Sequence, residues 1–104
     1  MAKIISYGST DFMKAYPGIS TRVAVHLFGR FDLLTSSPAE YLRDHEEYFH
    51  GLLYALFITG ALKEEQYEDL MDLVIDLCYE SDVELRKEAF VEFMLGLQQK
   101  STDK

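Results

Sequence analysis

Apolar side chains recur at helical spacing over three long stretches of the chain, with polar residues at the positions between them. From Ser20, a suitable N-cap, apolar residues return every three or four positions as far as Leu34. The same spacing predicts helices over 63–80 and 81–99, and Ser81 begins a capping pattern for the second of them. The core face expected for the last helix consists of Leu85, Ala89, Phe90, Phe93, Met94 and Leu97.

The two ends of the chain lack this long periodicity. Residues 1–8 include β-branched residues but no second strand, which predicts an extended arm that could pair with another copy. Asp11–Ala15 is expected to form a short helix that Pro17 ends. Residues 101–104 are polar and are expected to form a frayed tail.

The stretch Tyr48–Ile58 is apolar in nearly every direction of a helical projection. A helix that is hydrophobic all round is typical of the middle of a fold. Ser37 is the expected N-cap, Pro38 stands at the first helical position, and Gly60 can adopt the left-handed conformation that ends a helix. The pattern therefore predicts a central helix against which the others pack.

Together these elements predict an all-α fold, a small helical bundle with three main helices and a short N-terminal helix or arm. A length of 104 residues indicates a single domain over 1–104. The single Cys78 excludes a disulfide within the chain and fits a reducing compartment. The longest apolar run, Leu52–Ile58, is far too short to cross a membrane, and no signal peptide is evident, so a soluble, cytoplasmic protein is expected.

The net charge of −8 is concentrated in the middle of the chain. Residues 37–85 carry thirteen acidic and two basic residues, whereas residues 1–36 carry two and four, and residues 86–104 carry three and four. Binding to a phosphate backbone needs clustered Lys and Arg. The distribution therefore disfavours direct binding of nucleic acid and favours a partner with a basic surface.

The acidic residues of the helix predicted over 63–80 fall on the side opposite its apolar face. A solvated helix side needs polar residues of some kind, and this is the simpler interpretation of the acids. The alternative is a docking surface for a basic partner, because like charges on one helix repel each other and mixed signs would be more stabilising. The candidate partner-binding residues are Glu64, Glu65, Glu68, Asp69, Asp72, Asp76, Tyr79 and Glu80.

Catalytic and metal-binding motifs are absent or incomplete. His45 and His50 are five residues apart and diverge on a helix, which excludes a zinc-protease pair. Glu47 and His50 have the spacing of a di-iron bundle motif, but the second pair that such a site requires is missing. Cys78 lies on an expected core face of an acidic helix, where burial and negative charge suppress thiol reactivity. We therefore expect no enzyme activity, no metal and no cofactor.

Two further groups of residues bear on self-association. Val91 and Leu95 lie four residues apart on the flank of the last helix, and they are the candidate contact of a homodimer. Arg22, His26 and Arg30 form a basic stripe at spacings of four. The stripe is interpreted as a counterpart to the acids, either within the bundle or in a second copy.

The leading hypothesis is a small acidic regulatory protein that acts by protein–protein interaction, as an inhibitor or an accessory factor. A narrower alternative is a DNA mimic, in which the acidic helix over 64–80 occupies the basic groove of a nucleic-acid-binding enzyme. A metal-binding bundle that uses Glu47 and His50 is the third alternative.

Overall fold

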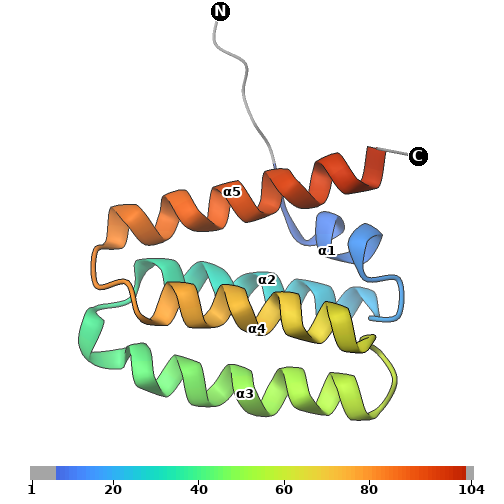
Figure 1. The fold of residues 1–104 in the computed structure, drawn as a ribbon, viewed down its shortest axis with the longest axis horizontal. Coiled ribbons are helices and arrows are strands. Elements are labelled where there is room, and N and C mark those ends of the chain that lie inside the picture. The colour runs from blue at the N-terminus through green and yellow to red at the C-terminus, as the bar shows by residue number, and fades with distance from the viewer. Residues whose placement is uncertain (1–6, 103–104) are drawn as a thin grey trace, which may run out of the picture.

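The computed structural model describes the backbone of residues 7–102 and the side chains of residues 7–99. Over that range the chain forms one all-α globule of five helices and contains no strand (Figure 1). A 3-10 turn, η1, precedes the third helix. The elements are α1 (Ser9–Ala15), α2 (Thr21–Ser36), η1 (Ala39–Tyr41), α3 (Leu42–Ile58), α4 (Glu64–Cys78) and α5 (Val83–Thr102).

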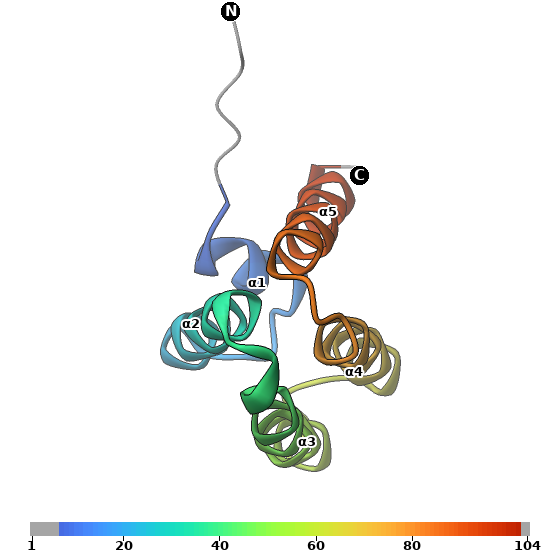
Figure 2. The same cartoon turned by 90° about the vertical axis from the view of Figure 1, so that its left-hand side faces the viewer.

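The prediction of an all-α bundle is confirmed, but the predicted count of three main helices is one too few. Four long helices follow the short α1. In Figures 1 and 2, α2, α3 and α4 run back and forth in the lower part of the molecule, while α5 crosses above α2 and α4 with α1 beside it. Of the helices described, none is long and apolar enough to span a membrane.

The core is built around Phe31 of α2. Its ring lies 5.9 Å from that of Phe12, 4.4 Å from that of Phe49 and 5.6 Å from that of Phe90, measured between ring centroids. These four side chains come from α1, α2, α3 and α5, and all are almost completely buried. Because one ring contacts three other helices, Phe31 stands at the centre of the core, although the far side of α2 leaves Val25 and Leu33 exposed.

The prediction that Tyr48–Ile58 forms a helix is confirmed, but the prediction that this helix is central is wrong. Only Phe49 and Leu53 of the stretch are fully buried, whereas Tyr54 is 53% exposed and Ile58 is 61% exposed. The helix α3 packs mainly against α4 at the edge of the bundle, and α5 covers the other side of α2 and α4. An apolar pattern gives the hydrophobicity of each helical face, but the positions of neighbouring helices decide which faces they cover.

The start of α3 also differs from the expected start. Ser37 is the C-cap of α2 rather than the N-cap of α3, and Pro38 is the N-cap of η1. The helix α3 begins at Leu42 with no side chain bonded to its first turn. Gly60 has a φ of +87°, so the predicted left-handed end of the helix is confirmed.

The long helices α2 and α5 are capped by short polar side chains. Ser20 Oγ accepts a hydrogen bond from the backbone N–H of Val23 at 3.1 Å, as expected for its N-cap position. At α5, Asp82 takes the role that the pattern assigned to Ser81, because its Oδ1 accepts from the backbone N–H of Glu84 at 2.9 Å.

At the chain ends, Tyr7 packs edge-on against Phe28 and Phe90, and α5 continues to Thr102, so the predicted frayed tail is partly helical. The rest of the predicted arm and tail, residues 1–6 and 103–104, lies outside the described residues.

Arg86 of α5 is completely buried, which its sequence context did not predict. Its guanidinium donates hydrogen bonds to the backbone carbonyls of Leu34 and Ser37, the latter at 2.7 Å. The last carbonyls of a helix have no partner within the helix, and a cation there also complements the helix dipole. Arg86 therefore fastens α5 to the end of α2.

Candidate functional site

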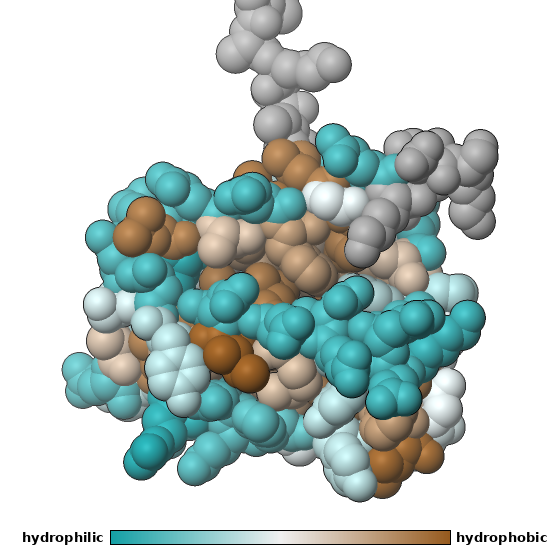
Figure 3. Space-filling model, viewed as in Figure 1, coloured by the Kyte–Doolittle hydropathy of each residue, from teal (hydrophilic) through white to brown (hydrophobic). Residues whose placement is uncertain are grey.

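The helix α4 presents an acidic face to solvent. Its capping box uses Gln66, whose Oε1 accepts from the backbone N–H of Lys63 at 2.9 Å. Leu70, Val74 and Leu77 are fully buried on the opposite side, which fixes the rotation of the helix. Figure 3 shows the resulting hydrophilic band along α4. Exposed on it, as predicted, are Glu64, Glu65, Glu68, Asp69, Asp72 and Asp76.

The last two predicted partner-binding residues follow the end of α4. Tyr79 is its C-cap and is 76% exposed, the highest exposure among the large apolar side chains described. Glu80 is only partly exposed, and its Oε2 accepts from the backbone N–H of Asp82 at 3.1 Å. Glu80 therefore belongs to the turn before α5 rather than to the open acidic face, which we define as the six exposed carboxylates of α4 together with Tyr79.

None of these carboxylates is neutralised within the described part of the chain. Across residues 7–99 the one ion pair within 4.0 Å joins His50 Nε2 and Glu46 Oε2, at 3.6 Å on α3. Carboxylates at spacings of four along α4, such as Glu68, Asp72 and Asp76, repel each other at a cost of about 0.2–0.5 kcal/mol per pair. The acidic face therefore carries an electrostatic cost that nothing in the described chain offsets.

The basic stripe of α2 contacts an aromatic side chain rather than the acids. His26 Nε2 lies 2.5 Å from the hydroxyl of Tyr48, and the guanidinium of Arg30 lies 3.9 Å from the centroid of the same ring. A guanidinium over an aromatic face is a favourable cation–π contact. Arg22 is exposed. The interpretation of the stripe as a counterpart to the acids within one chain is therefore wrong.

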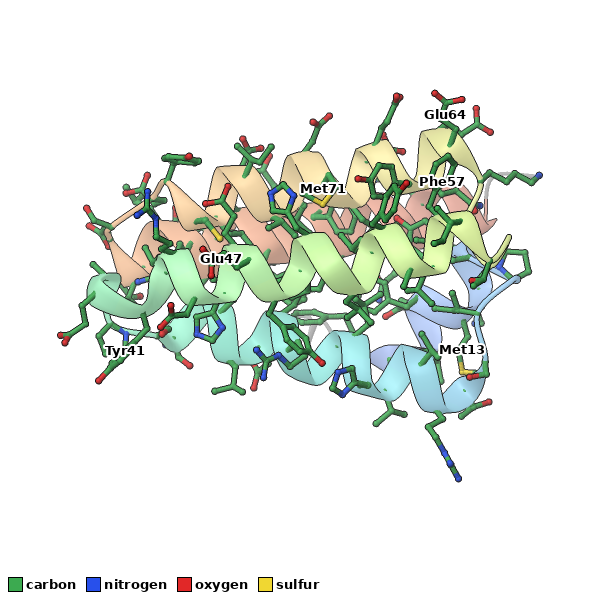
Figure 4. The ribbon with its side chains drawn as sticks, turned by 90° about the horizontal axis from the view of Figure 1, so that it is seen from below. Met13, Tyr41, Glu47, Phe57, Glu64 and Met71 are labelled. Carbon is green, nitrogen blue, oxygen red and sulfur yellow. The ribbon has the colours of Figure 1, made fainter. Side chains whose placement is uncertain are left out.

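A shallow hollow of about 400 Å³ lies beside the acidic face, between α3 and the end of α4. Arg43, Glu46, Glu47 and His50 line it from α3, and Tyr79 lines it from α4. The four α3 residues follow the spacing i, i+3, i+4, i+7, so the sequence did contain a signal for this polar flank. Figure 4 shows the labelled Glu47 on this side of α3. The hollow extends the acidic face from α4 onto α3.

Cys78 lies at the edge of this region, is 8% exposed, and lines a second shallow hollow next to Tyr79. Burial, and then the carboxylate of Glu46, raise the pKa of its thiol to about 11, against a smaller opposite effect of Arg86. The thiol is therefore protonated at neutral pH, and a protonated thiol is a poor nucleophile.

The two histidines considered as metal ligands point to different sides of α3, as the spacing predicted. His45 Nε2 lies 3.1 Å from Ser37 Oγ, and burial, together with Arg30, lowers the pKa of this histidine. His50 is exposed and lies in the hollow with Glu47. Within the described residues, no three His, Cys, Asp or Glu side chains are grouped so that they could hold a metal ion.

Val91 and Leu95 lie on α5 and are both partly buried. Leu85, which the pattern assigned to the core face of the same helix, is instead 47% exposed. Among the large apolar side chains described on the long helices, Ile58 of α3 is the most exposed, at 61%, although the apolar pattern had placed it in the core.

Comparison of the chain with protein-family models, with curated proteins and with solved structures finds no match.

Proposed function

We propose that this protein is a non-enzymatic regulator, an inhibitor or an accessory factor, that docks the acidic face of α4 onto the basic surface of a protein partner. The observation that carries the proposal is a row of six exposed carboxylates, none of which forms an ion pair within 4.0 Å in the described chain. A basic partner would remove their mutual repulsion and, through electrostatic steering, speed association.

The exposed ring of Tyr79 supports a partner rich in arginine. Tyrosine is enriched at the hot spots of protein–protein interfaces, and its ring face attracts guanidinium groups. Glu46 and Glu47 line the hollow next to this ring. An arginine side chain placed in the hollow would therefore meet the aromatic face of Tyr79 and the carboxylates of Glu46 and Glu47, against the single arginine of the hollow, Arg43.

Affinity capture with matched charge variants tests the proposal. The test variant reverses Asp69, Asp72 and Asp76 to lysine, and the control variant reverses Asp32, Glu88 and Glu92, which are exposed on α2 and α5. Both variants change the net charge by the same amount. We expect the test variant to lose the partner captured by the wild type, and the control variant to retain most of it. Equal capture by the two variants would contradict docking through α4.

A DNA mimic is the narrower form of the same proposal. Its support is that the carboxylates of α4 follow one another along a straight helix, at spacings of a few Å that resemble the charge spacing of a duplex. In this form the captured partner is a nucleic-acid-binding enzyme, and short duplex DNA competes with the protein for it. A partner that duplex DNA leaves bound indicates a basic protein surface of another kind.

A further inference from the structure

Ser37 connects three helices at one end of the bundle. It is the C-cap of α2, its backbone carbonyl accepts a hydrogen bond from the guanidinium of Arg86 at 2.7 Å, and its hydroxyl oxygen lies 3.1 Å from Nε2 of His45. Arg86 belongs to α5, and His45 lies in the first turn of α3. These three residues, which we call the junction, therefore fasten α3 and α5 to the end of α2.

The surroundings of His45 favour a neutral ring with its proton on Nε2. The hydroxyl of Ser37 donates to the carbonyl of Pro38 at 3.5 Å, so its oxygen can accept from the Nε2–H of the histidine. The other ring nitrogen, Nδ1, is buried and has no hydrogen-bond partner in the described chain. A second proton would create a buried N–H group without an acceptor at Nδ1, which is costly.

Two arginines add to the cost of a positive charge on His45. Arg86 is completely buried at the junction, and its Nε has no partner among the described residues. Arg30 of α2 lies over the ring of Tyr48, which follows His45 by three residues and so stands one turn further along α3. Both arginines act on the histidine in the direction that disfavours its charged form.

The other titratable groups near the junction do not offset these arginines. Asp44, next to His45 on α3, favours the charged ring but is exposed, and Glu46 already has a partner within α3. Cys78 on the α4 side is a neutral thiol, and Glu40 of η1 is exposed. Burial, followed by the arginines, therefore holds the pKa of His45 below its ordinary value of 6.5.

We propose that the junction is an acid-sensitive switch, in which protonation of His45 releases the first turns of α3 from the end of α2. The folded junction binds the second proton more weakly than the unfolded chain does. The stability that the neutral ring contributes is therefore complete above pH 6.5 and is lost as the pH falls below that value.

Release of α3 has a local consequence at Cys78. Leu42, Arg43 and Glu46 belong to the first turns of α3, and they line the shallow hollow in which this thiol lies. When these turns leave the end of α2, the hollow widens and the thiol becomes accessible. The switch does not depend on the proposed docking of a partner.

An NMR titration of the three histidine rings tests the protonation step. His45→Gln assigns the resonance of His45 by its disappearance. We expect this ring to titrate below pH 6.5, and we expect Arg30→Met to move its midpoint upwards by removing one of the two cations. A His45 ring that titrates at pH 6.5 or above in the wild type would overturn the proposal.

Urea denaturation at pH 7.5 and pH 5 tests the effect on stability. The amide of His45→Gln can donate to the hydroxyl of Ser37 but does not titrate, and His50→Gln removes an exposed histidine of the same helix as a matched control. Between the two pH values, the ratio of unfolded to folded protein should rise about fivefold more in the wild type than in His45→Gln. His50→Gln should not remove this difference. An equal pH dependence in the wild type and in His45→Gln would exclude the switch.

The reactivity of Cys78 tests whether α3 is released locally. The disulfide 4,4′-dithiodipyridine reacts with thiols at acid and at neutral pH, and a small free thiol corrects for its intrinsic rate. Relative to that thiol, Cys78 should react about fivefold faster at pH 5 than at pH 7.5 in the wild type, and equally at both in His45→Gln. A wild-type thiol that is protected equally at both pH values would show that protonation leaves α3 in place, and the proposal would be wrong.

Discussion

The helices α2 and α3 are nearly equal in length, with 16 and 17 residues, and both are rich in aromatic and aliphatic side chains. They nevertheless contribute differently to the core. Phe31 of α2 contacts aromatic rings from three other helices, whereas α3 packs mainly against α4. Both helices also leave large apolar side chains more than half exposed, Val25 and Leu33 on α2 and Tyr54 and Ile58 on α3. Apolar content therefore does not decide how many neighbours a helix has in the core.

The largest expected effect comes from truncating the side chain that α2 places at the centre. Phe31→Ala should lower the free energy of unfolding by about 3–5 kcal/mol, because it leaves a cavity among Phe12, Phe49 and Phe90. Tyr54→Ala on α3 should cost less than about 1 kcal/mol, because the side chain of Tyr54 is 53% exposed.

Urea denaturation measures both changes, and Phe31→Leu provides a folded reference if Phe31→Ala does not fold. Similar losses for Phe31→Ala and Tyr54→Ala would mean that α2 and α3 contribute equally to the core.

A second pair of variants compares the stability contributed by two arginines, the buried Arg86 at the end of α2 and the exposed Arg22 on α2. Arg86→Ala should cost about 2–4 kcal/mol, since it creates a cavity, removes the donor of the Ser37 carbonyl and leaves the Leu34 carbonyl with only the backbone N–H of Ser37. Arg22→Ala, which removes the same charge from an exposed position, should change stability by about 0.5 kcal/mol or less. Thermal unfolding followed by circular dichroism separates the two. A small effect of Arg86→Ala would show that α5 is held to α2 by apolar contacts alone.

The sequence predicted the parts of this fold that depend on local chemistry. Ser20 at the start of α2, Gly60 after α3 and the exposure of the α4 carboxylates all follow from capping, φ preference and periodicity within a few residues. The position of α3 at the edge depends on where α5 crosses, which no local pattern contains.

The same reason explains the residues that the sequence analysis missed. Arg86 stands among polar positions of α5, and it is buried because its partners are carbonyls about fifty positions earlier in the chain. Tyr48 of α3 contacts His26 and Arg30 of α2, and spacing within α2 alone could not show that this tyrosine is the partner of the basic stripe.

The packing of α3 against α4 can be tested through the reactivity of the Cys78 thiol. Cys78 lies on α4 where the first turns of α3 pack. Burial and Glu46 raise its pKa to about 11, so the thiol should react slowly with iodoacetamide at pH 8 and faster as the pH approaches 11.

The pKa of Cys78 is raised by folding, so the associated stability is present below the unfolded value of about 9 and is lost as the pH rises towards 11. By pH 10 the loss should be about 1 kcal/mol, and Cys78→Ala should remove that part of the pH dependence. Rapid alkylation at pH 8 would show that α3 leaves this part of α4 open.

The smallest expected effect compares the two exposed glycines of α2 and α3. A Cβ atom would meet nothing within 4 Å at Gly29 or at Gly51, so Gly29→Ala and Gly51→Ala should each stabilise the dilute protein by about 0.4–1 kcal/mol. Gly18→Ala should do the opposite, because its Cβ would lie 2.2 Å from the carbonyl oxygen of Ala61. Urea denaturation measures the three changes. A Gly51→Ala variant that gains clearly less than Gly29→Ala would show that the exposed side of α3 is less open than that of α2, and a Gly18→Ala variant as stable as the wild type would show that the backbone at Ala61 moves to admit a side chain.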